Sequence, residues 1–169
     1  MPKSSNSKFF VYIFWILLFV VGYYGFNTFI QNRNNPNQAP QTEINQRGQH
    51  VVYLQANPSH SYIVNGYINQ YPVTFLVDTG ASSVVVPHAI AQKIGLSKGQ
   101  AYEAYTANGV ITVYDTTIDN LSIGNISLSN VRASINPAEE GKQVLLGMSA
   151  LKKLEFQYKN NRLILIQNK

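Results

Sequence analysis

The stretch FLVDTGASS, residues 75–83, places the carboxylate of Asp78 directly after an apolar run. Apolar surroundings disfavour an ionised carboxylate unless partners offset the loss of solvation. Gly80 permits a backbone conformation or a close approach that side chains forbid, and Thr79 offers a hydroxyl that can fix a loop. The residues alone leave two interpretations open. Asp78 caps a turn after a strand, as Asp-x-Gly commonly does, or it is a functional carboxylate in a shaped loop.

On both sides of this stretch the residues predict an all-β domain. Val, Ile, Thr and Tyr recur with a period of two, which is typical of half-buried strands. We expect strands over residues 50–55, 61–69, 71–77, 101–106, 110–118, 121–126, 128–135, 155–158 and 162–167, with apolar runs at 83–86 and 144–146. Short helices are expected over His88–Leu96, ended by Gly95, and from Ser149 as its cap through Leu154. Because the order of strands, apolar run and helix occurs twice, we predict a small β barrel with internal pseudo-symmetry.

Three motifs, in order along the chain, resemble those of the retropepsin-like aspartic proteases. They are Asp-Thr-Gly-Ala-Ser at 78–82, Thr-Ala-Asn-Gly at 106–109 and Leu-Leu-Gly-Met-Ser-Ala-Leu at 145–151. The resemblance covers His50–Lys169 and is closest to the bacterial single-domain, membrane-anchored branch. It implies a small, closed, all-β retropepsin-like (acid protease) barrel with one or two short helices and the activity of an aspartic-type endopeptidase.

The resemblance also implies a role for each motif. The residues that match the catalytic positions are Asp78, Thr79 and Gly80. Those that match substrate-binding positions are Ala81, Thr106, Ala107, Asn108 and Gly109. Those that match the structural segment beside the site are Leu145, Leu146 and Gly147. Residues 106–109 correspond to the flap, a hairpin that covers the substrate, and Asn-Gly is itself a strong hairpin signal. Residues 145–147 correspond to the segment that threads beside the catalytic loop.

Peptide hydrolysis of this kind needs two carboxylates that share a proton, one to activate water and one to protonate the carbonyl oxygen. The chain has a single Asp-Thr-Gly, and residues 145–147 at the pseudo-equivalent position hold no acid. We therefore expect a homodimer in which each copy contributes Asp78 and which cleaves polypeptides. A membrane-tethered, non-catalytic binding or assembly module of the same fold is an alternative. A serine hydrolase pairing of Ser82 or Ser83 with His88 lacks the Gly-x-Ser-x-Gly elbow.

The N-terminal region predicts a membrane anchor. Residues 9–30 carry no charged side chain, and as a helix they would measure about 33 Å, enough to cross a hydrocarbon core. Lys3 and Lys8 precede this segment, which predicts a cytoplasmic N-terminus over residues 1–8. The rest of the chain would then lie on the periplasmic (extracytoplasmic) side of the cytoplasmic (inner) membrane, as a single-pass protein. A cleaved signal peptide, with Val20 and Gly22 as a weak cleavage pattern, is the alternative.

Residues 31–49 separate this anchor from the protease-like domain of residues 50–169. They are rich in Asn, Gln and Pro, and their one aliphatic residue besides Ala is Ile44. Such a segment buries too little apolar surface to offset the entropy of ordering, so we expect a flexible tether.

Composition excludes several other classes of protein. In a chain of 169 residues, 45% hydrophobic and 12% charged residues argue against disorder, and the length after the anchor suits one domain. The chain has no cysteine, which excludes disulfides, a thiol nucleophile and thiolate metal sites. Its three histidines have no spacing that suggests a shared metal, so we expect no metal and no cofactor. The net charge of +5 is scattered along the chain, and we expect no nucleic-acid partner.

Overall fold

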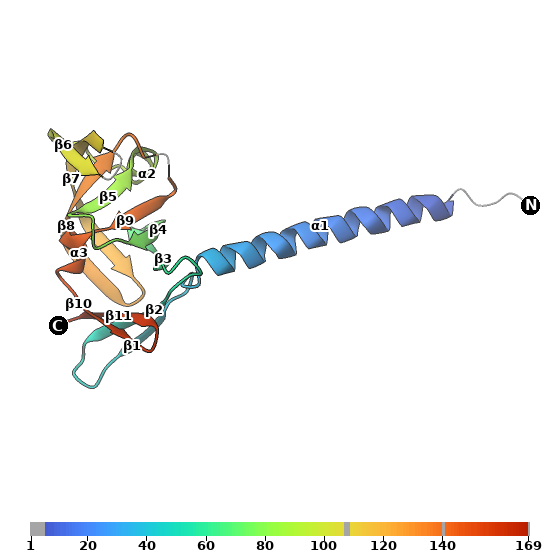
Figure 1. Ribbon diagram of the computed structural model, residues 1–169, viewed down its shortest axis with the longest axis horizontal. Helices are drawn as coiled ribbons and strands as arrows, with labels where there is room; N and C mark the ends of the chain where they lie inside the picture. The colour runs from blue at the N-terminus through green and yellow to red at the C-terminus, as the bar shows by residue number, and fades with distance from the viewer. Residues whose placement is uncertain (1–5, 107–108, 140, 169) are drawn as a thin grey trace, which may run out of the picture. The chain divides into compact units, whose positions relative to one another are not determined.

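Eleven strands and three helices are found in the part of the chain that the computed structural model describes, residues 6–106, 109–139 and 141–168 (Figure 1). The chain divides into two compact units, with the boundary between Asn34 and Asn35. The first unit is helical, and the second, which we call the β domain, contains every strand.

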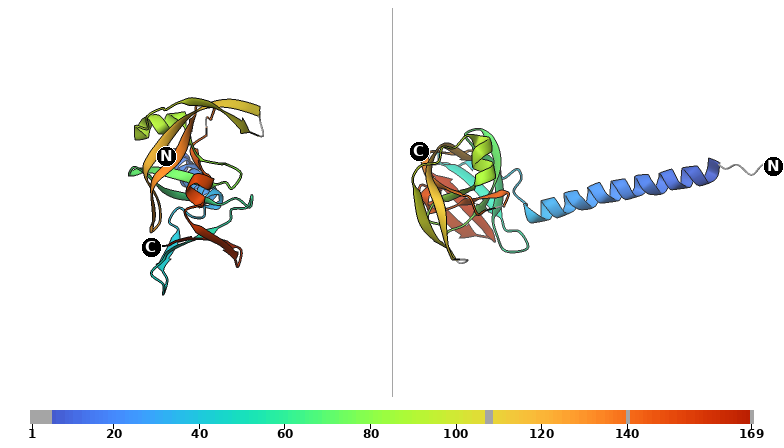
Figure 2. Two further views of the ribbon diagram at one scale, coloured as in Figure 1. Left: turned by 90° about the vertical axis from the view of Figure 1, so that its left-hand side faces the viewer. Right: turned by 90° about the horizontal axis from the view of Figure 1, so that it is seen from above.

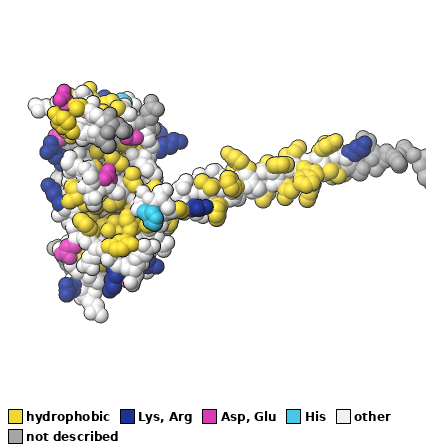
Figure 3. All heavy atoms as spheres, in the orientation of Figure 1, with side chains coloured by type: hydrophobic (Ala, Val, Ile, Leu, Met, Phe, Trp, Pro, Cys, Tyr) yellow, Lys and Arg dark blue, Asp and Glu magenta, His cyan; other side chains and the backbone are white. Residues whose placement is uncertain are grey.

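Helix α1 (Asn6–Asn34) is apolar on every side. From Phe9 to Val21 all residues are apolar or aromatic, and their side chains are exposed. Figure 3 shows hydrophobic side chains along the face of the helix that is in view. A helix that is hydrophobic all round needs an apolar environment such as a membrane. By length and composition the 27 residues Lys8–Asn34 could cross one, although a signal sequence would meet the same criteria.

The larger sheet of the β domain closes into a barrel. Its strands lie in the order β3 (Ile63–Ile68), β4 (Tyr71–Val77), β9 (Gln143–Leu146), β5 (Val84–Pro87), β8 (Ile126–Asn136), β7 (Gly109–Ile123) and β6 (Ala101–Thr106). β3 also pairs with β7, at Tyr67 with Ser122 and Ile68 with Leu121, which joins the two sides of the sheet. The core between them includes the fully buried Phe75. The prediction of a small, closed all-β barrel is confirmed.

Four further strands form a second, antiparallel sheet. Their order is β1 (Gln41–Ile44), β2 (His50–Gln55), β11 (Arg162–Gln167) and β10 (Glu155–Lys159). One face of this sheet contributes Val52, Leu54 and Leu165 to the core, where each is fully buried. The C-terminal strand β11 is therefore a central strand, enclosed by neighbours of its own chain on both edges.

The two short helices follow β5 and β9, as expected from the repeated order. Helix α2 (His88–Ile94) ends at Gly95, whose φ of +78° is the left-handed conformation that glycine adopts readily. Helix α3 is Met148–Leu151, and its N-cap is Gly147. The prediction that Ser149 caps this helix is wrong, because its side chain instead bonds to two neighbouring strands.

One strand of the barrel is longer than predicted. The strands expected at residues 110–118 and 121–126 are the single strand β7, which ends at Ile123. Its apolar alternation breaks at Asp119, which suggested a boundary, but the ladder to β8 continues on both sides of that residue. Pairing with a neighbour therefore keeps the strand extended where its own periodicity fails.

The prediction of a flexible tether over residues 31–49 is wrong. Residues 31–34 belong to α1, and Gln41–Ile44 form β1, which pairs with β2 along its whole length. Between them Asn37 is buried, with 2% of its surface exposed, and forms an isolated bridge to Val64 of β3. The folded β domain thus begins at Asn35, far earlier than residue 50.

Hydrogen bonds of Asn37 explain this difference. Its Nδ2 donates to the carbonyl oxygens of Gln55 (2.9 Å) and Ile63 (2.7 Å), and its Oδ1 accepts from the backbone N–H of Gln55 at 2.7 Å. The carboxamide thus satisfies the backbone groups of β2 and β3 where no neighbouring strand does. Hydrogen bonds therefore hold this polar segment in place. The prediction of a tether weighed only the apolar surface that the segment can bury against the entropy of ordering it, and so left these bonds out.

We expect Asn37→Ala to lower the free energy of unfolding by about 2–3 kcal/mol, since it leaves buried backbone groups without partners. Asn37→Asp should be at least as harmful, because it keeps an acceptor but loses both donors. Urea titration of the full chain in non-ionic detergent, followed by near-ultraviolet circular dichroism, measures this. Gln46→Ala, at an exposed position, is the control, and equal stability of the two alanine variants would contradict the assignment.

Candidate active site

Asp78 lies at the end of β4, where the chain turns away from the barrel. Its half-buried side chain accepts a hydrogen bond at Oδ1 from the backbone N–H of Gly80 (2.9 Å). Its own carbonyl oxygen accepts one from the N–H of Ala81 (3.3 Å). The carboxylate is therefore oriented by its own loop, which we call the Asp78 loop, residues 78–83. The turn geometry expected of Asp-x-Gly is present, and it leaves Oδ2 available for chemistry.

The segment after β9 holds the Asp78 loop in place. Val77 and Leu146 are parallel neighbours, and the Asp78 N–H donates to the Leu146 carbonyl oxygen at 3.2 Å. At the other end of the loop, the N–H of Met148 donates to the carbonyl oxygen of Ala81 (2.8 Å). Main-chain bonds thus connect both ends of the loop to residues 146–148. The structure places residues 145–147 beside the loop, as the sequence predicted.

Gly147 allows this close contact. It is buried, and a Cβ at this position would clash with the Ser83 carbonyl and lie 2.7 Å from the Ala81 carbonyl oxygen. Real Cβ atoms do not approach backbone oxygens so closely, so any other residue would push the two segments apart. Its φ of −87° is ordinary, which means that space, not backbone strain, requires glycine.

We expect Gly147→Ala to lower the free energy of unfolding by about 1–3 kcal/mol, as overpacking does. Since it also displaces the Asp78 loop, the peptide hydrolysis that the sequence resemblance leads us to expect should fall by about 100-fold or more. Gly141→Ala is the matched control, because a Cβ there would meet only the flexible Glu139 side chain. Near-normal turnover of a folded Gly147→Ala protein would contradict the role of this contact.

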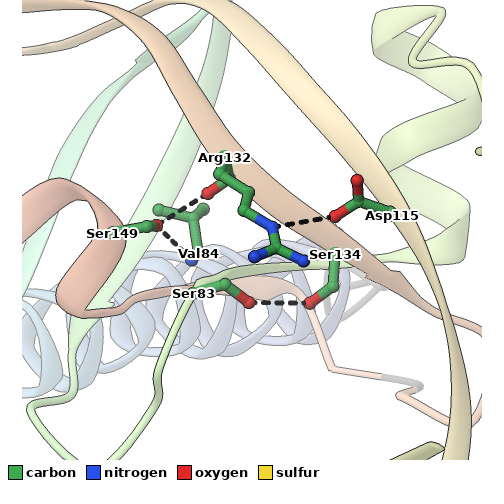
Figure 4. A network of polar contacts seen from close by, with 6 residues as sticks. All are labelled: Ser83, Val84, Asp115, Arg132, Ser134 and Ser149. Carbon is green, nitrogen blue, oxygen red and sulfur yellow. Dashed lines mark hydrogen bonds and ion pairs between the residues drawn. The ribbon is translucent and has the colours of Figure 1, made fainter. Parts of the chain in front are cut away.

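Three serines of this region take part in a polar network that the sequence did not predict (Figure 4). Ser149 Oγ donates to the Arg132 carbonyl oxygen (2.6 Å) and accepts from the Val84 N–H (2.9 Å). The hydroxyls of Ser83 and Ser134 lie 3.1 Å apart. These bonds connect α3, β5 and β8 at the end of the Asp78 loop, where Ser83 is its last residue. The only signal in the sequence was the position of Ser149 within the 145–151 motif.

The predicted flap is the β6–β7 hairpin. Thr106 pairs with Gly109, and Thr106 Oγ1 donates to the Gly109 carbonyl oxygen at 2.8 Å. Gly109 has a φ of +113°, which a residue with a side chain rarely adopts. Ala107 and Asn108, which were also assigned to the flap, lie outside the described residues. The hairpin extends from the rest of the β domain (Figure 2), and 83% of Tyr105 is exposed.

The structure brings the base of this hairpin close to the Asp78 loop. Ser82 and Ser83 from the loop and Tyr102 from β6 line one hollow of about 320 Å³.

Tyr62, whose carbonyl oxygen accepts a bond from the Val77 N–H, precedes β3 on the other side of β4. Burial, with a smaller effect of the nearby Tyr158, raises the pKa of Tyr62, so this phenol remains neutral at acidic and neutral pH. Among the described residues, no group of three His, Asp or Glu side chains could hold a metal ion.

Comparison with known proteins agrees with this arrangement. The model of a family described as gag-polyprotein putative aspartyl protease matches residues 64–153, which include Asp78, the hairpin and the 145–151 motif. The crystal structure of a retropepsin-like aspartic protease from Rickettsia conorii is similar, with a TM-score of 0.57 and 25% sequence identity. That similarity covers 76% of this chain and 94% of the Rickettsia chain.

Two curated relatives are themselves uncharacterized. A protein encoded in the 5′ region of cobV in a Sinorhizobium species is 32% identical over 111 residues, covering 64% of this chain and 48% of that protein. A protein of Rickettsia prowazekii (strain Madrid E) is 30% identical over 119 residues, covering 68% and 50%. This chain therefore spans about half the length of the curated relatives that it matches. On the matched family model and the shared barrel, the chain belongs to the retropepsin-like aspartic protease family.

Proposed function

We propose that this protein is an exported, membrane-anchored aspartic endopeptidase whose active site forms between two copies of the chain. One observation carries the proposal. Asp78 is held in a braced loop, and the segment that braces it, Leu145-Leu146-Gly147, has no acidic side chain. Each chain therefore supplies one carboxylate of a pair, and a second copy related by a two-fold axis supplies the other.

The chemistry of such a pair needs one ionised and one protonated carboxyl group. The ionised Asp78 takes a proton from water as the water oxygen bonds to the peptide carbonyl carbon, and the protonated Asp78 of the other copy gives its proton to the carbonyl oxygen. In the second step the C–N bond breaks. The first Asp78 then gives its proton to the leaving nitrogen, and the second recovers a proton from a hydroxyl group. Both carboxyl groups end in their starting states.

Other residues have supporting roles in this proposal. Gly80 orients the carboxylate through its N–H, and Thr79 and Ala81 complete the loop. The hairpin around Gly109 covers an extended polypeptide, which pairs its backbone with that of the enzyme. The left-handed conformation of Gly109 gives the hairpin tip a geometry that a side chain would strain.

Helix α1 serves as the anchor. Lys3 and Lys8 precede the apolar stretch of this helix, which favours a cytoplasmic N-terminus and a β domain on the periplasmic side of the inner membrane. Because ordered structure resumes at Asn35, directly after α1 ends at Asn34, few residues are left for a tether. Confinement on a membrane would raise the effective concentration of chains and favour pairing.

The experiment that tests this function is incubation of the purified full chain, in non-ionic detergent micelles, with a diverse peptide library. We expect internal cleavage, found by mass spectrometry, without added metal or cofactor. If peptides bind but none is cleaved at any pH between about 3 and 8, the non-catalytic module of the same fold is the correct interpretation.

A further inference from the structure

A polar hollow lies at the end of the Asp78 loop. Its volume is about 320 Å³, and it lies between that loop and the first flap strand, with Ser82 and Ser83 on one side and Tyr102 on the other. The remaining lining residues come from β8, α3 and the turns beside them: Asn130, Arg132, Ser149, Lys152 and Lys153. The buried polar network of Figure 4 forms its inner side, which fixes the position of the hydroxyl groups.

The hollow carries an excess of positive charge. Three of its lining residues, Arg132, Lys152 and Lys153, are cationic, and none is acidic. In the described part of the chain, the acid that forms an ion pair with these cations is Asp115, whose Oδ1 lies 3.1 Å from Arg132 Nε. This pairing uses one edge of the guanidinium and leaves its two terminal nitrogens for another acceptor.

Part of this charge is held in place by the fold. Lys153 Nζ donates to the carbonyl oxygens of Ser129 (2.7 Å) and Asn130 (3.2 Å), which fixes a cation at the rim. In Figure 4 the guanidinium of Arg132 and the Ser83–Ser134 hydroxyl pair lie on the same side of strand β8. A carboxylate that entered the hollow would meet the fixed ammonium group of Lys153 and the hydroxyl pair of Ser83 and Ser134 beside the Arg132 side chain, which is 71% exposed. The fixed groups lower the conformational entropy that binding costs.

On the basis of the peptidase function above, we propose that this hollow binds an acidic side chain, Glu or Asp, of the polypeptide substrate. Ser82 follows Asp78 by four residues, a path of at most about 14 Å, and an extended peptide advances about 3.3 Å per residue. The acidic residue therefore lies within about four residues of the cleaved bond. In a two-fold dimer the hollow occurs twice, so acidic residues are selected on both sides of that bond.

The test compares peptides that differ only by Glu or Gln at single positions up to four residues from the cleaved bond. With the full chain in non-ionic detergent at about 50 mM salt, we expect kcat/KM to be about tenfold higher for the Glu peptide at one or more positions. At about 0.5 M salt the preference should fall below about threefold, because ions screen exposed charges.

Variants identify the cations responsible. The double variant Arg132→Gln and Lys152→Gln should lose most of the Glu preference, measured as the ratio of kcat/KM for the Glu peptide to kcat/KM for the Gln peptide. The double variant Lys142→Gln and Lys159→Gln, an equal loss of charge at two exposed positions outside the hollow, is the control and should keep the preference. The same preference in wild type and double variant, or no preference at any position, would overturn the proposal.

A binding measurement separates this proposal from the proposed function. Fluorescence anisotropy with the Asp78→Asn protein and labelled Glu and Gln peptides reports the hollow without turnover. If the wild type cleaves no peptide, the endopeptidase function fails, and tighter binding of the Glu peptide that depends on Arg132 and Lys152 still supports the hollow. Equal binding of both peptides overturns the proposal that the hollow binds an acidic side chain, and it leaves the endopeptidase function standing where cleavage is observed.

Discussion

Replacement of Asp78 by Asn should abolish peptide hydrolysis, with kcat lowered by about 10³–10⁴-fold or more, and leave the fold intact. In the proposed two-copy active site both carboxylates are lost at once, and with them the proposed base for water and the proposed acid for the carbonyl oxygen. The loop should keep its shape, because an Asn oxygen can accept the Gly80 N–H bond that Asp78 Oδ1 accepts now. The measurement is turnover of a cleaved library peptide, with near-ultraviolet circular dichroism as the test of folding.

Asp119→Asn is the matched control for this prediction. Asp119 is exposed on β7, so loss of its charge should leave turnover within about twofold of wild type. Peptide binding by the Asp78→Asn protein should persist, since the hairpin and the hollow remain. A folded Asp78→Asn protein that cleaves at the wild-type rate would remove Asp78 from the catalytic role.

Removal of β11 should have an equally large effect, through folding. This strand pairs with β2 over six residue pairs and with β10 over five, and Leu165 is fully buried in the core. A chain that ends at Asn161 would leave the buried Val52 and Leu54 uncovered and split the four-stranded sheet. Each large buried side chain contributes about 1.5–3 kcal/mol, so losing several is comparable with the whole stability of an ordinary domain, about 5–15 kcal/mol.

The chain that ends at Asn161 should therefore show no near-ultraviolet circular dichroism signal and no peptidase activity. A chain that ends at Gln167 keeps the whole strand and should retain both. Leu163 and Leu165 alternate with Ile164 and Ile166, so the strand is apolar on both faces, as is typical of a strand at a subunit interface or inside a sheet. The structure shows it in a sheet of its own chain. A truncated chain that stays folded, dimeric and active would show that the four-stranded sheet is dispensable.

Some features followed from the sequence because they depend on local rules. The alternation of apolar residues predicted most of the strands, and Gly95 predicted the end of α2. The positive φ of Gly109 agrees with the hairpin signal of Asn-Gly. The position of residues 145–147 beside the Asp78 loop was implied by the resemblance of three motifs to those of the retropepsin-like aspartic proteases. Periodicity alone would not have placed segments so far apart in sequence next to each other.

Other features depend on tertiary hydrogen bonds that no local pattern reports. Residues 31–49 have the composition of a polar tether. Asn37 nevertheless attaches its part of this segment to the β domain by hydrogen bonds to backbone groups 18 and 26 positions away. Ser149 reads as a helix cap, but its hydroxyl connects β5 to β8. The cationic hollow is likewise invisible in the sequence, because Arg132 and Lys152 are brought to Ser82 only by the closure of the barrel.

The most direct test of the two-copy active site is subunit mixing. Wild-type chain is mixed in detergent with an excess of Asp78→Asn chain, exchanged to equilibrium at fixed total protein, and assayed per wild-type chain. If each active site takes one Asp78 from each of two chains, activity per wild-type chain falls in proportion to the wild-type fraction, to about one half at equal amounts and about one tenth at one in ten. Activity per wild-type chain that stays constant across these mixtures, in preparations shown to exchange subunits, would contradict the account.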